Sequence, residues 1–296
     1  MSLRLEMLQV ARLAPKLLGD SADLVAAFLR GQLNPDGGFK DRAGNSDLYY
    51  TVFGVEGLFA LRADLPLGPL DSYLRSFGDG GGLDFVHLAC LARCWAMLPP
   101  ESVPPQTRDA VLRGLEACHT ADGGYAPAPG QAHGTVYNGF LALGAYQDLR
   151  SAVPNPGGLL ACLAALRAAD GGYANQRDLP MGLTPSTAAA VTILRQLGQP
   201  VDPALADWLL ARCRPDGGFF ATPAAPIPDL LSTATALHAL AGMKAEVGKV
   251  KIREPCLDFI DTLWSSEGAF FGNWEDDALD CEYTYYGLLA LGHLSL

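Results

Sequence analysis

A short glycine-rich motif recurs along the whole chain. It consists of an acidic residue, a pair of glycines and usually an aromatic residue, and its copies begin at Asp36, Asp79, Asp122, Asp170, Asp216 and, in a degenerate form, Glu267. Successive copies lie 43 to 51 residues apart. Such a period is typical of repeat proteins, in which neighbouring units bury each other's apolar faces. The sequence therefore predicts six repeats within one domain over residues 1–296.

Two kinds of helical segment alternate around these loops. The segment before each loop is amphipathic, as in the first repeat, where Leu24, Val25, Phe28 and Leu29 share one face. The segment after each loop is nearly free of charge, and these segments cover residues 48–61, 83–98, 135–146, 187–197, 233–243 and 283–294. A helix with one apolar stripe covers a core, whereas a helix that is apolar on all sides is buried on all sides.

This alternation predicts an all-α fold, an α/α toroid or barrel of six helical hairpins with an outer and an inner ring. An open superhelix would expose one face of each inner helix to water, which their apolar character disfavours. We expect residues 1–19 to form an extra helix that covers one end of the ring. In each loop, a glycine after the helix permits the left-handed backbone that ends it. The following aromatic residue is expected to pack on the outer ring, so the loops are interpreted as structural.

Composition narrows the possible functions. The net charge of −11 disfavours nucleic acid, which selects for clustered basic residues. The seven cysteines are scattered without a CxxC pair, as expected for buried, reduced thiols. We find neither a signal peptide nor an uncharged apolar run of the ~18 residues that a membrane span needs. These features predict a cytoplasmic protein.

The loop and the start of the following segment carry a family resemblance. The run from Gln32 to Phe39 followed by residues 46–51, and the run from Pro215 to Phe219 followed by residues 228–233, resemble the β subunits of protein prenyltransferases and the squalene and terpenoid cyclases. The resemblance implies a central funnel whose mouth is formed by the starts of the inner helices. It also implies a prenyl diphosphate or another apolar small molecule as ligand, and a possible helical partner subunit.

Protein prenyltransferases of this family bind a catalytic zinc ion through Asp, Cys and His. In the fifth repeat Asp229 matches, but Ser232 stands where the histidine belongs. In the sixth repeat Asp280 matches, but Glu282 and Tyr283 occupy the positions of the cysteine and the histidine. The sequence therefore predicts no zinc site of the family type and no zinc-dependent protein prenylation.

The second repeat offers a weaker set of metal candidates. Asp84, His87 and Cys90 follow one another at helical spacing, and His87 and Cys90 could share one face. The alternative interpretation is a core histidine with a core thiol. We predict no cofactor, although this set leaves zinc or magnesium open.

The start of the last inner segment resembles the acidic Asp-x-Asp-Asp motif of class II terpenoid cyclases. There a protonated carboxylic acid delivers a proton to an alkene. The resemblance implies Glu282 as the central acid, with Asp280 beside it, and Asp229 is the third candidate catalytic carboxylate. The alternative is a solvated acidic loop in which Asp280 caps the helix. Such cyclases usually pair two rings, whereas this chain has the length of one.

Further candidates follow from their place at the mouth. The candidate substrate-binding residues are Tyr49, Tyr50, His133, Tyr137, Tyr283, Tyr286 and Arg42. Tyrosine rings could line an isoprenoid chain, while His133 and Arg42 could meet a diphosphate. The alternative for the tyrosines is ordinary packing within the ring of helices, with their hydroxyl groups at the mouth.

Two functions of different classes remain open. The first is an isoprenoid-binding prenyl transferase or cyclase that acts on a prenyl diphosphate in the central cavity. The second is a non-catalytic toroid that serves as a lipid-binding or protein-interaction scaffold.

Overall fold

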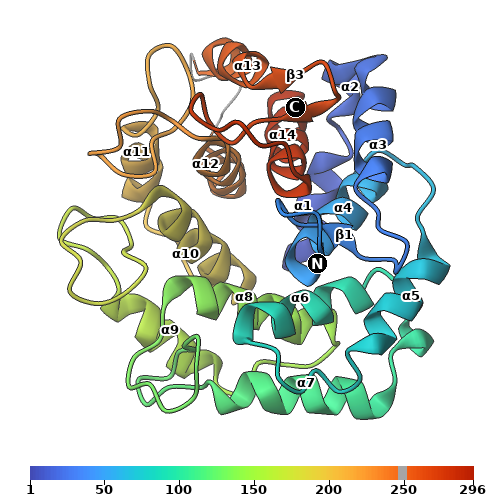
Figure 1. Cartoon of the computed structure of the whole chain (residues 1–296). Coiled ribbons are helices and arrows are strands. Elements are labelled where there is room, and N and C mark those ends of the chain that lie inside the picture. Colours follow the sequence, from blue (N-terminus) through green and yellow to red (C-terminus); the bar gives the residue numbers. More distant parts are fainter. Residues whose placement is uncertain (246–251) are drawn as a thin grey trace.

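The computed structural model describes residues 1–245 and 252–296, and within them the helices form two concentric rings (Figure 1). The inner ring consists of α4 (Leu48–Ala60), α6 (Phe85–Trp95), α8 (Val136–Asp148), α10 (Thr184–Gln196), α12 (Leu230–Gly242) and α14 (Cys281–Leu294). The outer ring consists of α3 (Ser21–Gly31), α5 (Leu67–Ser76), α7 (Pro105–Ala117), α9 (Pro156–Ala165), α11 (Ala204–Leu210) and α13 (Arg253–Thr262). A short 3-10 turn, η1 (Pro100–Ser102), precedes α7.

One polar connection lies partly outside the described residues. Residues 243–255 carry several lysines and an arginine. The sequence predicts either a solvated loop or a patch that binds phosphate or a partner. Lys249 and Lys251 of this connection lie outside the residues that the structure describes.

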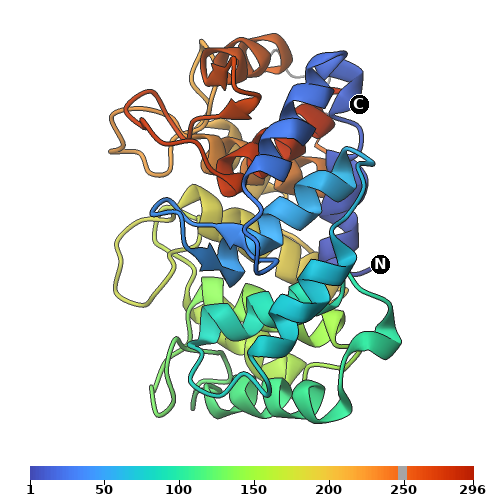
Figure 2. The same cartoon turned by 45° about the vertical axis from the view of Figure 1, so that its right-hand side comes forward.

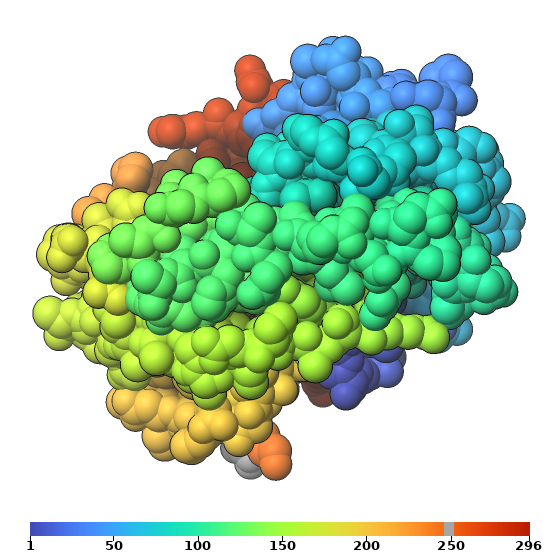
Figure 3. All heavy atoms as spheres, turned by 90° about the horizontal axis from the view of Figure 1, so that it is seen from below, coloured from blue at the N-terminus to red at the C-terminus, as the bar shows by residue number. Residues whose placement is uncertain are grey.

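The inner ring is closed. Each inner helix packs on the next one along the chain, and α14 packs on α4. The predicted toroid is thus confirmed, and the open superhelix is wrong. In Figure 3 the green and lime segments, which contain α7 and α9, form a continuous outer wall on one side of the ring.

Side-chain caps fix where the inner helices begin. Asp84 accepts a hydrogen bond from the backbone N–H of His87, and Asp229 accepts one from the N–H of Ser232. Such a cap satisfies one of the free N–H groups in the first helical turn. The helix at Asp229 therefore begins at Leu230, three residues earlier than the sequence analysis placed it.

The glycine-rich loops connect the two rings. In the first repeat Gly37 has a φ of 95°, and a Cβ atom there would lie 2.1 Å from the carbonyl oxygen of Pro69. The next aromatic residue donates its backbone N–H to a threonine of the following inner helix, from Phe39 to Thr51 Oγ1 at 2.9 Å. The Phe39 ring packs against Gly54 of α4. The sequence predicts that this aromatic side chain packs on the outer ring of helices. It does not predict the contact with the inner helix.

Short antiparallel strand pairs accompany two of the loops. β1 (Phe39–Lys40) pairs with β2 (Ser46–Asp47) in the first repeat, and β3 (Trp264–Ser265) pairs with β4 (Ala269–Phe270) in the sixth. Each pair holds an aromatic residue of the loop motif in extended backbone beside its inner helix. The strands are thus part of the loop structure and form no separate layer.

The N-terminal segment closes one end of the ring. It forms α1 (Leu3–Ala11) and the short α2 (Pro15–Leu18). The guanidinium of Arg4 pairs with Asp148 at 2.9 Å, and the Leu3 N–H donates to Gln147 Oε1 at 2.8 Å. Both partners lie at the carboxyl end of α8. Figure 2 shows the two chain termini on the side opposite to the long loops. Because α1 covers the end of the ring on the side of the termini, the mouth of the ring lies on the side of the loops.

The structure bears on two further predictions, one about membrane-spanning helices and one about the cysteines. None of the helices in residues 1–245 and 252–296 combines the length and apolarity that crossing a bilayer requires. The seven cysteines are free thiols, and all but the half-buried Cys213 are buried. This agrees with the reduced, buried thiols that the sequence predicts.

Candidate active site

A cavity of about 260 Å³ lies at the centre of the inner ring. Its walls come from the inner helices, and its closed end comes from α1. Its apolar lining includes Val52, Phe53, Ala89, Phe140, Leu141, Ala188, Ala189, Leu231, Tyr286 and Leu289. The inner helices are therefore apolar on their outer sides, where they meet the outer ring, and also on the side that faces the cavity.

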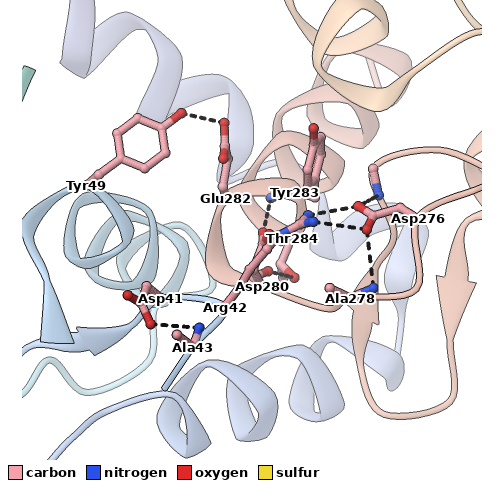
Figure 4. Close-up of polar contacts among 11 residues, drawn as sticks. Asp41, Arg42, Ala43, Tyr49, Asp276, Ala278, Asp280, Glu282, Tyr283 and Thr284 are labelled. Atoms are coloured by element: carbon pink, nitrogen blue, oxygen red, sulfur yellow. Dashed lines mark hydrogen bonds and ion pairs between the residues drawn. The ribbon is translucent and has the colours of Figure 1, made fainter. Parts of the chain in front are cut away.

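A carboxyl group faces this cavity at its mouth end. Glu282 lies in the first turn of α14, and its Oε1 accepts a hydrogen bond from the hydroxyl of Tyr49, with 2.5 Å between the oxygens (Figure 4). Burial raises the pKa of Glu282 to about 7, since a buried carboxylate loses its hydration. The hydrogen bond from Tyr49 lowers this pKa and the charge of Asp280 raises it. Glu282 is therefore protonated in a substantial fraction of molecules at neutral pH.

This arrangement suits proton donation. Oε1 of Glu282 accepts the hydrogen bond from Tyr49, so Oε2 carries the proton when Glu282 is neutral. Glu282 lines an apolar cavity. The aromatic rings of Phe53, Phe140 and Tyr286 line the same cavity. Aromatic faces attract positive charge, so this lining can stabilise a carbocation that forms beside the acid.

Two salt bridges hold the start of α14 against the first repeat. Arg42 Nε donates to Asp280 Oδ2 at 2.7 Å, and Arg42 Nη2 donates to Asp276 Oδ2 at 2.8 Å (Figure 4). The guanidinium lies over the ring of Tyr283, 5.5 Å from its centre. Asp280 also accepts the Tyr283 N–H and so caps α14. These four residues fix the backbone next to Glu282, but they do not themselves line the cavity.

The remaining predicted site residues divide between the cavity and its surroundings. Tyr137, Tyr49 and Tyr286 line the cavity, and Tyr137 is 39% exposed. Tyr50 packs edge-on against Tyr49 and is not part of the lining. The side chain of His133 is 55% exposed and lies 3.4 Å from Asp122, away from the cavity.

The candidate carboxylate Asp229 serves the start of α12. Its Oδ1 accepts the Ser232 N–H at 2.7 Å, and its Oδ2 accepts the Ser232 hydroxyl at 2.7 Å. Burial raises its pKa. Asp229 does not line the cavity, so the structure gives it the role of a helix cap.

The weak metal candidates of the second repeat do not converge on one point. His87 Nδ1 lies 2.9 Å from Asp84 Oδ1, and His87 Nε2 lies 3.1 Å from Asp47 Oδ2. Both ring nitrogens thus already have carboxylate partners. Cys90 faces the cavity, where burial raises the pKa of its thiol to about 12. Throughout the described part of the chain, no three His, Cys, Asp or Glu side chains are grouped as metal ligands.

Sequence reasoning missed a group of charged residues at the closed end of the cavity. Arg93, Asp148 and Arg4 of α1 line that end. Arg93 forms a bidentate pair with the fully buried Glu56, with both contacts at 2.6 Å. The available signal was the charge itself, because Glu56 and Arg93 interrupt segments that are otherwise nearly uncharged.

The comparisons with known proteins agree with this architecture. The family model of the prenyltransferase alpha-alpha toroid domain matches residues 7–75, 70–153 and 187–295. A search of curated protein sequences gives no significant match.

Several solved structures share the fold at low sequence identity. A variant of the type II terpene cyclase MstE from Scytonema, in complex with its substrate geranylgeranyl dihydroxybenzoate, is 14% identical, with a TM-score of 0.63 and coverage of 95% of this chain and 97% of that chain. Protein geranylgeranyltransferase-I of Candida albicans, complexed with GGPP, is 14% identical, with a TM-score of 0.58 and coverage of 98% and 82%. A glycosidase variant in complex with glucose is 16% identical, with a TM-score of 0.58 and coverage of 97% and 96%.

These similarities establish the fold. The matched cyclase chain is covered to 97% by this single ring, so that cyclase also has the length of one ring. The glycosidase shows that the same ring carries other chemistry, so fold alone does not identify a reaction. The repeat loops, the closed double ring and the family match over most of its length show that this chain belongs to the prenyltransferase α/α-toroid family.

Proposed function

We propose that this protein binds an isoprenoid in its central cavity and cyclises it by protonating a carbon–carbon double bond, with Glu282 as the acid. The observation that carries the proposal is a carboxyl group with a pKa of about 7 that faces an apolar, aromatic-lined cavity. General acid catalysis is efficient when the pKa of the acid lies near the working pH. Burial raises the pKa of Glu282 most, and the negative charge of Asp280 raises it further, while the positive charge of Arg42 lowers it.

The step is balanced without another reactant. The proton leaves Glu282 Oε2 and bonds to one carbon of the terminal alkene, which leaves a carbocation on the other carbon. The π electrons of a second alkene attack this cation and close a ring, and a final proton loss to water restores a double bond. Glu282 regains its proton from solvent, so the overall reaction is an isomerisation.

The charges around the mouth favour a neutral ligand over a prenyl diphosphate. Arg42 is already paired with two carboxylates, and Arg177 is paired with Asp122 at 2.9 Å. His133 faces the same aspartate. A diphosphate would have to displace these partners and would meet the acidic residues beside them.

The size of the cavity limits the ligand. Small-molecule sites usually enclose about 300–1,000 Å³, and this cavity lies just below that range. It therefore suits a short isoprenoid, of geranyl or farnesyl size, better than a long one.

The test is turnover in deuterated water. We would incubate the protein with farnesol, geraniol and the corresponding diphosphates, and analyse extracts by gas chromatography and mass spectrometry. The expected product is a cyclic isomer that carries one deuterium, because Glu282 exchanges its proton with solvent. Glu282→Gln should lower the rate by roughly 10²–10⁴-fold, the range for loss of a general acid. Asp277→Asn, at an exposed acid nearby, is the matched control and should leave the rate unchanged.

Two results would contradict the proposal. A product that forms equally well with Glu282→Gln would remove the acid from the mechanism. Ligand binding without any turnover would favour a non-catalytic, lipid-binding ring. The helical partner subunit implied by the family resemblance stays a prediction, which co-purification from the native host would test.

A further inference from the structure

The closed end of the cavity is polar, in contrast to its walls. Arg93, Thr192 and His238 are each the ninth residue of their inner helices, α6, α10 and α12, and all three line the cavity. Residues at the same position of neighbouring inner helices lie at about the same depth in the ring. These three side chains, which we call the polar floor, therefore form one layer across the cavity.

Two members of the polar floor have hydrogen-bonding capacity that the protein leaves unused. His238 is only 6% exposed, and its Nδ1 lies 3.0 Å from Nε2 of His293. His238 Nε2 is buried and has no hydrogen-bond partner among the described residues. A buried polar atom without a partner loses the free energy of its hydration, so such atoms normally have one.

Arg93 also has N–H groups that no described residue accepts. Its Nε and Nη2 both donate to Glu56, which leaves Nη1 with no acceptor in the described part of the protein. The Arg93 side chain is 16% exposed, and it lines the cavity. Its unused N–H groups can therefore reach a molecule inside the ring.

The charges of the floor select for a neutral group. Glu56 neutralises Arg93, and Asp148 neutralises the neighbouring Arg4 at 2.9 Å. The Glu6 carboxylate lies 3.8 Å from His238 Nε2, which favours the tautomer with a proton on that nitrogen. The floor thus offers hydrogen-bond donors with little net charge, which suits an uncharged oxygen atom.

We propose that the polar floor binds a hydroxyl or carbonyl oxygen at one end of an otherwise apolar ligand, with His238 and Arg93 as the donors. The isoprenoid nature of the ligand rests on the proposed function, whereas the polar floor itself does not. Glu282 is the second residue of α14, so the floor lies seven residues deeper, or about 10 Å at the rise of an α-helix. A ligand bound in this way places its oxygen at the floor and its far double bond at Glu282. The substrate class is therefore an oxygenated isoprenoid, bound with its polar end inward.

The experiment compares ligands that differ at one end. Dissociation constants would be measured by isothermal titration calorimetry for farnesol, its methyl ether and the hydrocarbon farnesene, using Glu282→Gln to slow turnover during the titration. Both oxygenated ligands should bind roughly five- to tenfold more tightly than farnesene, the ratio expected for one hydrogen bond. The ether should match the alcohol, because the floor supplies the donors.

Variants locate the source of this preference. Adding His238→Phe, which replaces the imidazole by an apolar ring without an N–H, should reduce the preference to about two- to threefold, because Arg93 remains as a donor, and should leave the affinity for farnesene unchanged. His119→Phe is the matched control, since His119 is a half-buried histidine outside the cavity whose Nε2 also lacks a partner in the described chain. It should retain the full preference.

Clear outcomes would overturn the proposal. Equal affinity for farnesol and farnesene, or a preference that His238→Phe leaves undiminished, would contradict the assignment of the ligand oxygen to His238 and Arg93. If His238→Phe does not fold, a crystal structure with farnesol decides, because an oxygen beside Glu282 would contradict the proposal. Failure of the proposed function looks different, since the oxygen preference would persist while the wild-type protein gave no cyclic product.

Discussion

Tyr49 and Glu282 join the first and last repeats through one hydrogen bond, from the tyrosine hydroxyl to Oε1 of the carboxyl group. The two residues lie 233 positions apart in the sequence. They meet because α14 packs on α4 when the ring closes. The candidate acid therefore depends on closure of the toroid, because its environment is completed by the opposite end of the chain.

Glu282→Gln should stabilise the folded protein at alkaline pH. The folded-state pKa of Glu282 is about 7, above the value of 4.5 for a free glutamate side chain. A raised carboxyl pKa means that the folded state is favoured while the group is protonated, and that this advantage is lost as the pH rises through 7. The variant should exceed wild type in unfolding free energy by on the order of 3 kcal/mol at about pH 8.5, and by little at about pH 5. Urea unfolding at both pH values checks this, and an equal difference at both would contradict it.

Tyr49→Phe should raise the pKa of Glu282 above its wild-type value. The tyrosine hydroxyl donates a hydrogen bond to Glu282 and so stabilises the ionised carboxylate. In Tyr49→Phe this hydrogen bond is absent, and the ionised form loses that stabilisation. Carbon-13 NMR titration of the glutamate carboxyl groups, with Glu282→Gln to assign the signal, measures the change. Tyr50→Phe is the matched control, because Tyr50 touches Tyr49 but does not line the cavity. A lower pKa in Tyr49→Phe would show that the hydrogen bond does not act as described.

Arg4→Met should destabilise the closed end of the ring in a pH-dependent way. Burial raises the pKa of Asp148 to about 6 although Arg4 lowers it, so removing Arg4 leaves a buried carboxylate without its partner. Breaking a buried ion pair from one side costs about 3–5 kcal/mol. The loss of unfolding free energy should be largest above about pH 7 and smaller near pH 5, where Asp148 binds a proton. Arg75→Met, which breaks the exposed pair with Asp71, should cost at most about 1 kcal/mol, and equally at both pH values. A loss that is the same at both pH values would contradict the role of Asp148.

Gly54→Ala should strain the contact between a repeat loop and its inner helix. A Cβ atom at this position would lie 2.1 Å from the ring of Phe39, so the loop or the helix must shift. Overpacking of this kind typically costs about 1–3 kcal/mol. Gly144→Ala is the matched control, since Gly144 is also inside an inner helix but has open space where its Cβ would be. That change should stabilise the protein by up to about 1 kcal/mol through helix propensity. Thermal unfolding of both variants checks the prediction, and similar melting temperatures would refute it.

The sequence was sufficient to predict the ring. The glycine-rich motif marks each repeat because its backbone conformation is local, and Gly37 has the positive φ that the motif implies. The missing charge in the segments after the loops indicated buried helices, and most residues of α4 are indeed buried, whereas Tyr137 of α8 is 39% exposed. The resemblance to the acidic cyclase motif also gave Glu282 as one of three candidate catalytic carboxylates, beside Asp280 and Asp229.

The tertiary structure decided what the sequence left open. Tyr50 and Tyr49 are adjacent, but only Tyr49 faces the cavity, because the rotation of a helix about its axis is set by packing and not by position in a motif. Arg93, Asp148 and His238 come from three different helices, and no spacing along the chain could show that they share one end of a cavity. Local conformation follows from neighbouring residues and is therefore visible in the sequence. The pKa of a buried acid and the composition of a cavity follow from residues brought together across the ring, so only the folded structure determines them.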